Sequence, residues 1–227
     1  MASDGVEGLL QVIDPCVARC VLQGVVNYSA AARLVASIAG RMGVRVPSDS
    51  AVKMRLIRWR NSSSDICYGL TCEQLLRVLA GTRAELREGV VVFTIPKSAF
   101  TRIEPLISRL LVEARLFHVL QGVASFTIIV DEEHAGDIRG AASEILEELS
   151  GQTAIVLVSP PEILTTPGFI AYIATLLAVN GVNITQVVSC YTDTLLILPS
   201  HVAPQAYQLI HRAIEVARKL AEENKAV

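Results

Sequence analysis

The sequence lacks the short motifs that mark most catalytic and nucleotide-binding sites. Its 227 residues contain no P-loop, no G-x-G-x-x-G, no G-x-S-x-G and no H-E-x-x-H. The four histidines are scattered along the chain, at His118, His134, His201 and His211. We therefore expect a protein that is not an enzyme and that needs no cofactor.

Long apolar runs are also missing, although 52% of the residues are hydrophobic and only 19% are charged. No segment is an uninterrupted apolar span long enough to cross a membrane. The N-terminal residues MASDGVEG are neither basic nor followed by a signal-like apolar core. We expect a cytoplasmic, globular protein with no membrane contact. The high apolar fraction predicts surface that is buried between subunits.

Cysteines are few, and their number, five, is odd, so they do not indicate a disulfide framework. Cys16 and Cys20 are four residues apart, and Cys67 and Cys72 flank a predicted turn. Neither pair has the C-x2-C spacing or the nearby histidines of a zinc site. We interpret all four as ordinary buried cysteines and expect no metal.

Charge is unevenly distributed around a formal net charge of -2. Up to Asn61, eight basic residues stand against four acidic ones, a balance of +4, so the remaining residues carry -6. The eight basic residues are Arg19, Arg33, Arg41, Arg45, Lys53, Arg55, Arg58 and Arg60. The chain thus has a basic N-terminal part and an acidic remainder.

Capping residues predict three short helices in the basic part. Their starts and ends are Asp14 with Gly24, Ser29 with Gly43, and Ser48 with Arg60. Helical periodicity predicts two buried faces, one of Ala31, Leu34, Val35, Ile38 and Met42 and one of Val52, Leu56 and Trp59. Three such helices are typical of a helix-turn-helix domain. Residues 27–60 resemble the N-terminal winged-helix-like modules of archaeal regulatory proteins.

The third predicted helix carries the candidate nucleic-acid-binding residues, which are Lys53, Arg55, Arg58 and Arg60. Arg55 and Arg58 flank one side of its buried face, whereas Lys53 and Arg60 lie nearer the other side. A helix in a major groove would present its charge from one exposed face, so this division counts against DNA binding. Two interpretations stay open. The helix binds duplex DNA, or it packs on the acidic remainder or on a partner protein.

Polar residues 61–65 form the best linker candidate and suggest domains at 1–64, 65–150 and 151–227. After the linker, Thr71 and Gln74 form a predicted capping box for a helix that Gly81 ends.

The last part of the chain predicts a β-α-β-β-α order. Its predicted elements are a strand at 154–158, a helix at 169–179, strands at 182–191 and 194–198, and a helix at 204–222. A degenerate copy starts about 65 residues earlier, with a strand at 90–95, a helix at 101–114, strands at 116–121 and 124–130, and a helix at 133–149. Each copy is most of a ferredoxin-like unit without its fourth strand. That strand is either exchanged between copies or chains, or a short one near Cys67 or Lys225.

Two short motifs in the second copy, Pro167-Gly168 and Asn183-Ile184, resemble those of the ACT domain of the aspartokinase type. The resemblance covers roughly the last third of the chain. It implies an α+β fold in which the N-terminal helical domain precedes two ferredoxin-like ACT (βαββα) repeats, because aspartokinase regulatory regions contain tandem ACT-like units. It also implies an amino-acid effector site at an interface between subunits or repeats, and at least a homodimer through the ACT-like domains.

The start of the predicted helix at 169–179 has chemistry suited to an amino acid. Backbone N–H groups there lack intrahelical partners and favour a carboxylate. Gly168 lets the backbone approach the ligand, Pro167 fixes the turn, and Asn183 can donate to the carboxylate and accept from the ammonium. The candidate ligand-binding residues are Thr166, Pro167, Gly168, Phe169, Asn183 and Ile184.

A purely structural alternative is that Pro-Gly only starts the helix and that Asn183 is a turn residue after Gly181. The corresponding loop of the first copy, residues 96–99, has no glycine. We therefore expect the first copy to be a scaffold.

These features predict a regulatory protein that senses an amino acid or a similar small effector. If the N-terminal domain binds DNA, the protein is a ligand-responsive transcription regulator. The alternative is a detached regulatory subunit, or interaction module, of an amino-acid biosynthetic enzyme such as an aspartokinase. A third possibility is a purely structural oligomer.

Overall fold

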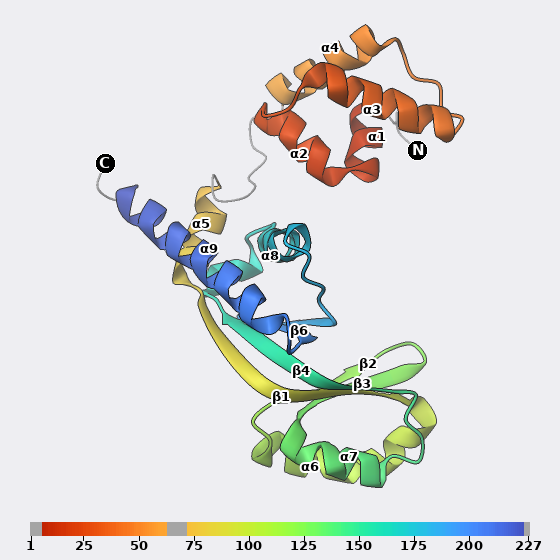
Figure 1. Cartoon of the computed structure of the whole chain (residues 1–227), viewed down its shortest axis with the longest axis vertical. Coiled ribbons are helices and arrows are strands. Elements are labelled where there is room, and N and C mark those ends of the chain that lie inside the picture. Colours follow the sequence, from red (N-terminus) through yellow and green to blue (C-terminus); the bar gives the residue numbers. More distant parts are fainter. Residues whose placement is uncertain (1–5, 63–71, 225–227) are drawn as a thin grey trace. The chain divides into compact units, whose positions relative to one another are not determined.

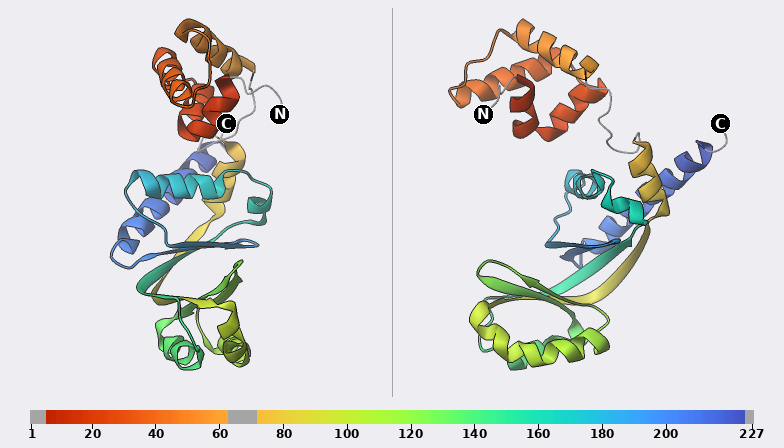
Figure 2. Two further views of the ribbon diagram at one scale, coloured as in Figure 1. Left: turned by 90° about the vertical axis from the view of Figure 1, so that its right-hand side faces the viewer. Right: turned by 180° about the vertical axis from the view of Figure 1, so that it is seen from behind.

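The computed structural model describes residues 6–62 and 72–224 (Figures 1 and 2). The chain divides into two compact units, Met1–Tyr68 and Gly69–Val227. None of the helices in these described ranges is long and apolar enough to cross a membrane.

The N-terminal unit is helical. Its helices are α1 (Val6–Ile13), α2 (Pro15–Gln23), α3 (Tyr28–Arg41) and α4 (Asp49–Ser62). The first of these was not predicted. One apolar cluster holds the four helices together, and it includes Val6, Leu10, Val21, Ala32, Val35, Val52 and Leu56.

The predicted cap of α2 is confirmed, and that of α3 is wrong. Asp14 accepts a hydrogen bond from the Val17 amide at 2.9 Å, and Gly24 ends α2 at a φ of 73°. The side chain that caps α3 belongs to Asn27, not Ser29, because Asn27 Oδ1 accepts from the amides of Ser29 and Ala30.

The predicted buried face of the second helix is confirmed only in part. Ala31 and Val35 are buried, whereas Leu34 and Ile38 are half-buried. Met42 is 57% exposed, because α3 ends at Arg41 and Met42 is its C-cap residue. Ala39 is fully buried on this helix instead.

The second unit is built on a six-stranded antiparallel sheet with the order β2-β3-β1-β4-β6-β5. The strands are β1 (Arg83–Pro96), β2 (Phe117–Gln121), β3 (Ser125–Asp131), β4 (Glu147–Val158), β5 (Gln186–Cys190) and β6 (Asp193–Pro199). The α-helices are α5 (Glu73–Gly81), α6 (Phe100–Glu113), α7 (Ala135–Ala141), α8 (Phe169–Val179) and α9 (Ala203–Glu223). Short 3-10 helices, η2 (Lys97–Ala99), η3 (Glu132–His134) and η4 (Pro161–Leu164), precede α6, α7 and α8.

Two long strands connect the halves of this sheet. β1 pairs with β4 along nearly its whole length, and its residues 90–96 also pair with β3 on the other side. Residues 152–158 of β4 pair with β6. Each half thus obtains its fourth strand from the other half, so the missing strand is exchanged between the copies within one chain. The register shifts beside Gly89 and Gly151, whose φ angles of 69° and 65° suit a glycine bulge.

Alternation along the strands separates two apolar cores. On one face, Val91, Phe93 and Ile95 of β1 belong to the cluster that packs with α6 and α7. On the other face, Val90 and Val92 join residues of the second half, among them Ala154, Val156, Leu195 and Ile197. The sheet is curled, with α6 and α7 outside one half (Figure 2).

Several predicted elements have other bounds. The strands predicted at 90–95 and 154–158 both begin earlier, because β1 starts at Arg83 and β4 at Glu147. The helix predicted at 133–149 stops at Ala141, and β4 already begins at Glu147, where it pairs with β1. The strand predicted at 182–191 is limited to β5. Cys72 is the residue before α5, and Thr71 of the predicted capping box lies outside the described residues.

The prediction of ordinary buried cysteines is also wrong in part. Cys72 is buried but disulfide-bonded, whereas Cys16 is exposed and Cys20 half-buried.

Candidate functional site

The turn between η4 and α8 shapes the candidate site. Thr166 is nearly buried, and its hydroxyl donates to the Glu162 carbonyl at 2.8 Å, which fixes the turn. Gly168 follows at a φ of 94° and is the N-cap residue of α8. Because glycine has no side chain to cap the helix, the first N–H groups of α8 keep their capacity to bind an anion.

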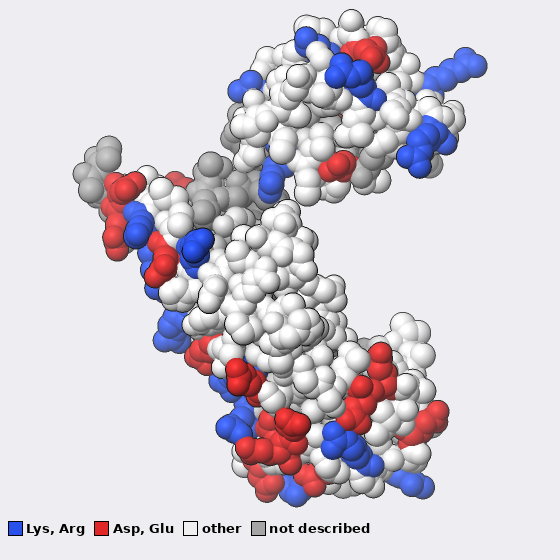
Figure 3. All heavy atoms as spheres, in the orientation of Figure 1, with Lys and Arg blue, Asp and Glu red and all other residues white. Residues whose placement is uncertain are grey.

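A cavity of about 330 Å³ lies at this corner. It is lined by Ile163, Leu164, Thr166, Gly168, Phe169, Ile170, Ala171, Ser189 and Tyr191. None of these residues is charged, and the whole stretch from residue 163 to residue 192 contains no Asp, Glu, Lys or Arg. In Figure 3 the surface where α8 lies in Figure 1 accordingly shows neither blue nor red.

The tip of the β5–β6 hairpin completes the cavity, and its residues were not among the predicted ligand-binding residues. Cys190 pairs with Asp193, so Tyr191 and Thr192 form a two-residue turn. Tyr191 has a φ of 54°, the one positive value among the described non-glycine residues. This conformation costs a bulky residue about 1–2 kcal/mol, and such strain is concentrated at functional sites.

The structure brings together only some of the predicted ligand-binding residues. Thr166, Gly168 and Phe169 line the cavity, and Pro167 is exposed beside it. Asn183 and Ile184 follow the other end of α8, an 11-residue helix, so about 16 Å of helix separates them from Gly168. Within one chain they do not line this cavity.

The predicted nucleic-acid-binding residues all lie on α4, which packs through the predicted Val52 and Leu56. Lys53, Arg55 and Arg58 are exposed. Arg60 is exposed as well, and its guanidinium lies against Gly24, where an added Cβ would be 2.4 Å from Arg60 Cζ.

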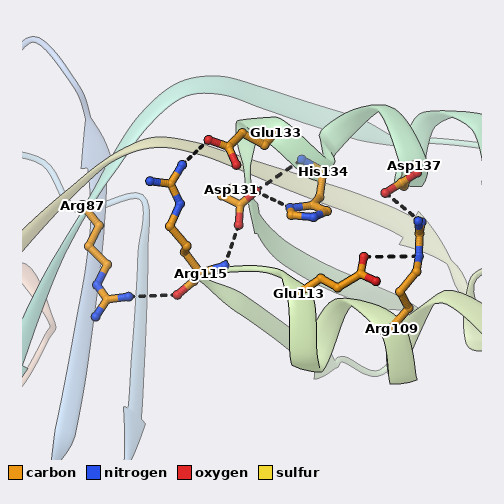
Figure 4. A network of polar contacts seen from close by, with 8 residues as sticks. All are labelled: Arg87, Arg109, Glu113, Arg115, Asp131, Glu133, His134 and Asp137. Atoms are coloured by element: carbon orange, nitrogen blue, oxygen red, sulfur yellow. Dashed lines mark hydrogen bonds and ion pairs between the residues drawn. The ribbon is translucent and has the colours of Figure 1, made fainter.

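A larger hollow, of about 700 Å³, opens beside the β1 bulge, but four of its charged residues, Arg87, Arg115, Asp131 and Glu133, belong to one network of polar contacts (Figure 4). Arg87 donates to the Arg115 carbonyl at 2.8 Å, and Arg115 pairs with Glu133. Asp131 accepts from the Arg115 amide at 2.9 Å and from His134 Nδ1 at 2.6 Å. We therefore interpret this network as structural.

The titration of the two central groups reflects these contacts. Burial alone would raise the pKa of Asp131, but the hydrogen bonds from His134 and from the Arg115 amide lower this pKa overall. The hydrogen bond to Asp131 raises the pKa of His134.

Residues 147–212, which run from the start of β4 into α9, match the family model of the ACT domain. This segment, less than a third of the chain, is similar to the ACT domain. The cavity at Gly168 is lined by residues within this match. The preceding half of the sheet, which pairs with the matched half through β1 and β4, has the same order of elements.

Solved structures with a similar fold include regulatory and complete aspartate kinases. An aspartate kinase from Clostridium acetobutylicum is 18% identical with a TM-score of 0.48, and the match covers 58% of this chain and 34% of that one. The regulatory subunit of aspartate kinase from Thermus thermophilus is 18% identical with a TM-score of 0.47, covering 60% and 97%. A protein of unknown function from Vibrio cholerae, described as a possible transport protein, is 22% identical with a TM-score of 0.46, covering 63% and 97%.

The match spans about a third of the length of the Clostridium enzyme. Curated protein sequences gave no match.

Proposed function

We propose that the second unit senses a free amino acid, whose carboxylate binds the first N–H groups of α8. The observation that carries this proposal is the cavity at an uncapped helix start, inside the ACT domain. Backbone donors at a helix N-terminus stabilise an anion without a cationic side chain. The hydroxyls of Ser189 and Tyr191 offer acceptors for the ammonium group.

The lining also favours one class of effector. Leu164 and Ile170 at the cavity are 60% and 38% exposed, and no charged side chain is available to pair with a charged ligand. Burying an unpaired charge is costly, so amino acids with uncharged, apolar side chains should bind better than lysine, arginine, aspartate or glutamate.

The same region is the surface through which we propose that two copies associate. β5 is an edge strand, and Val187 on it is 45% exposed, while Val179 of α8 is 75% exposed. An apolar edge of this kind needs a partner. A second copy would also supply the Asn183 that one chain holds too far from Gly168.

The output of effector binding follows from the N-terminal unit. In a ligand-responsive transcription regulator this unit would bind DNA, whereas in a regulatory subunit of an amino-acid biosynthetic enzyme, such as an aspartokinase, it would bind that enzyme. The exposed basic residues of α4 favour the first of these outputs.

A thermal-shift screen of the twenty amino acids on the full chain tests the effector site. A true effector present at a hundredfold excess over its Kd stabilises the folded state by about 2.7 kcal/mol and raises the Tm. We expect Gly168→Asp to abolish this rise, because its carboxylate competes for the N–H donors, and Asn183→Ala to weaken it.

Two variants serve as controls. Gly168→Ala has the same backbone strain without the charge, and Ser98→Asp places the charge at the corresponding loop of the other half. Both should keep most of the rise. A screen in which no amino acid changes the Tm contradicts the proposal.

A further inference from the structure

Most basic residues in the described part of the N-terminal unit, residues 6–62, form no ion pair. Residues 6–62 contain eight basic residues and three acidic ones, Glu7, Asp14 and Asp49. All ion pairs found in the described parts of the chain join residues between 73 and 215. Arg19 aside, the basic residues of this unit make none, and these are Arg33, Arg41, Arg45, Lys53, Arg55, Arg58 and Arg60. Such a surface suits a polyanion. Blue side chains outnumber red ones on this unit in Figure 3.

The helix α4 presents an uncharged ridge on the side opposite its core. Val52 and Leu56 are fully buried, which fixes the inward face. At 100° per residue, the outward face follows the spacing i, i+4, i+7 and i+11, and it consists of Ser50, Met54, Ile57 and Asn61. Ser50 and Asn61 are exposed, and Met54 is 51% exposed. Hydrogen-bonding and apolar side chains therefore share the ridge.

Basic residues border this ridge on both sides. Lys53 lies on one flank, and Arg55 and Arg58 lie on the other; all three are exposed. Arg60 is on the Lys53 flank; it is also exposed, and its guanidinium lies beside Gly24.

We propose that α4 enters the major groove of duplex DNA with this ridge toward the bases. The groove is about 12 Å wide and has a phosphate backbone on each side, so a helix inside it benefits from cations on both flanks. Asn61 has the amide that pairs with adenine, Ser50 can donate or accept, and Met54 can contact a thymine methyl group. In the sequence, the division of charge between two flanks counted against DNA binding. In the structure it favours DNA binding, because an uncharged ridge, exposed except at the half-buried Ile57, separates the flanks.

This inference does not depend on the amino-acid site. An acidic partner protein would also attract the cations, but it would not require base-reading groups between two charged flanks. Salt dependence and sequence discrimination therefore separate the two partners.

The first test measures fluorescence anisotropy of a labelled mixed-sequence duplex of about 21 bp with the full chain, between about 50 and 200 mM salt. Wild-type binding should weaken linearly on a log-log plot. Arg55→Ala with Arg58→Ala should lower the magnitude of the slope by about 1.8, at about 0.9 for each lost phosphate contact. Lys97→Ala with Arg102→Ala removes the same charge from the second unit and should leave the slope unchanged.

The second test selects bound sequences from a random duplex pool. Asn61→Ala should reduce discrimination between the selected duplex and the random pool by on the order of tenfold, with an unchanged salt slope. Circular dichroism confirms that each variant is folded. The proposal is overturned if the wild type shows no salt-dependent binding, if the two double variants lose the same slope, or if polyglutamate binds as tightly as the duplex.

Discussion

At the scale of single residues, two glycines should respond in opposite ways to the same substitution. Gly168 has a φ of 94° and open space where a methyl group would lie, so Gly168→Ala suffers only from its backbone conformation. We expect it to lower the free energy of unfolding by about 1–2 kcal/mol. Gly140 lies in α7 with open space around it and no positive φ, so Gly140→Ala should raise that free energy by up to about 1 kcal/mol.

Urea denaturation of both variants checks the pair. They lie in the same compact unit, so differences in domain stability do not affect the comparison. If both variants lose stability equally, the positive φ of Gly168 does not decide the outcome.

The Asp131–His134 contact should make stability depend on pH. The raised pKa of His134 means that its contribution is fully present below its unfolded value of 6.5 and is lost as pH rises through the folded pKa. The lowered pKa of Asp131 means that its contribution is present above 3.8 and is lost as pH falls through the folded pKa. The pair therefore stabilises most between these two values.

We expect the wild type to lose more unfolding free energy than His134→Gln between about pH 6 and about pH 9, because only the wild type loses a charged partner there. His201 is exposed, so His201→Gln should behave as the wild type does. Parallel pH profiles for wild type and His134→Gln would show that the contact carries no charge.

At the scale of elements, one arginine joins α9 to the end of α5. Arg218 donates from Nε to the Ala80 carbonyl at 3.1 Å and from Nη2 to the Thr82 carbonyl at 3.0 Å. These carbonyls lie at a helix C-terminus, which a cation stabilises. Arg218→Ala should lower the free energy of unfolding by about 1–2 kcal/mol and speed amide hydrogen exchange in α5. Arg212→Ala, from the same helix without such contacts, should change neither.

Elements with clear boundaries could be predicted from the sequence. The helix predicted at 169–179 is confirmed as α8, and that at 204–222 differs from α9 by one residue at each end. Predicted boundaries were wrong where pairing with another strand decides where an element begins or ends. Glu147–Leu149 looks helical in isolation, but pairing with β1 makes it a strand, and that pairing depends on bulges that local patterns do not reveal.

Only one side of the candidate site, the turn at the start of α8, could be predicted from the sequence. Pro167-Gly168 indicates its own turn, because glycine and proline have strong backbone preferences. Ser189 and Tyr191 line the cavity because of the register of the β5–β6 hairpin. Asn183 does not line it, because α8 separates Asn183 from Gly168. These relations are tertiary, so no local motif contains them.

At the scale of the whole molecule, the proposed association of two copies should depend on the edge strand β5. Val187→Lys places a charge on this edge and should shift the protein toward the monomer in light scattering at micromolar concentration. Val123→Lys is the matched control, because Val123 is 98% exposed but lies in a turn. Deletion of residues 1–64 should leave the oligomer intact. A wild-type monomer would contradict this assembly.

The two units should influence each other if the proposed effector and DNA act on one regulator. By thermodynamic linkage, an amino acid that changes DNA affinity by some factor must have its own affinity changed by DNA by the same factor, typically about 5- to 150-fold. Anisotropy titrations with and without the amino acid measure one side of this cycle, and calorimetric titrations of the amino acid with and without duplex measure the other. Deletion of residues 1–64 should preserve the Tm rise and abolish the response to DNA. If the amino acid binds but DNA affinity is unchanged, effector binding does not alter DNA binding by the N-terminal unit. An enzyme partner then becomes the better explanation of the basic surface of this unit.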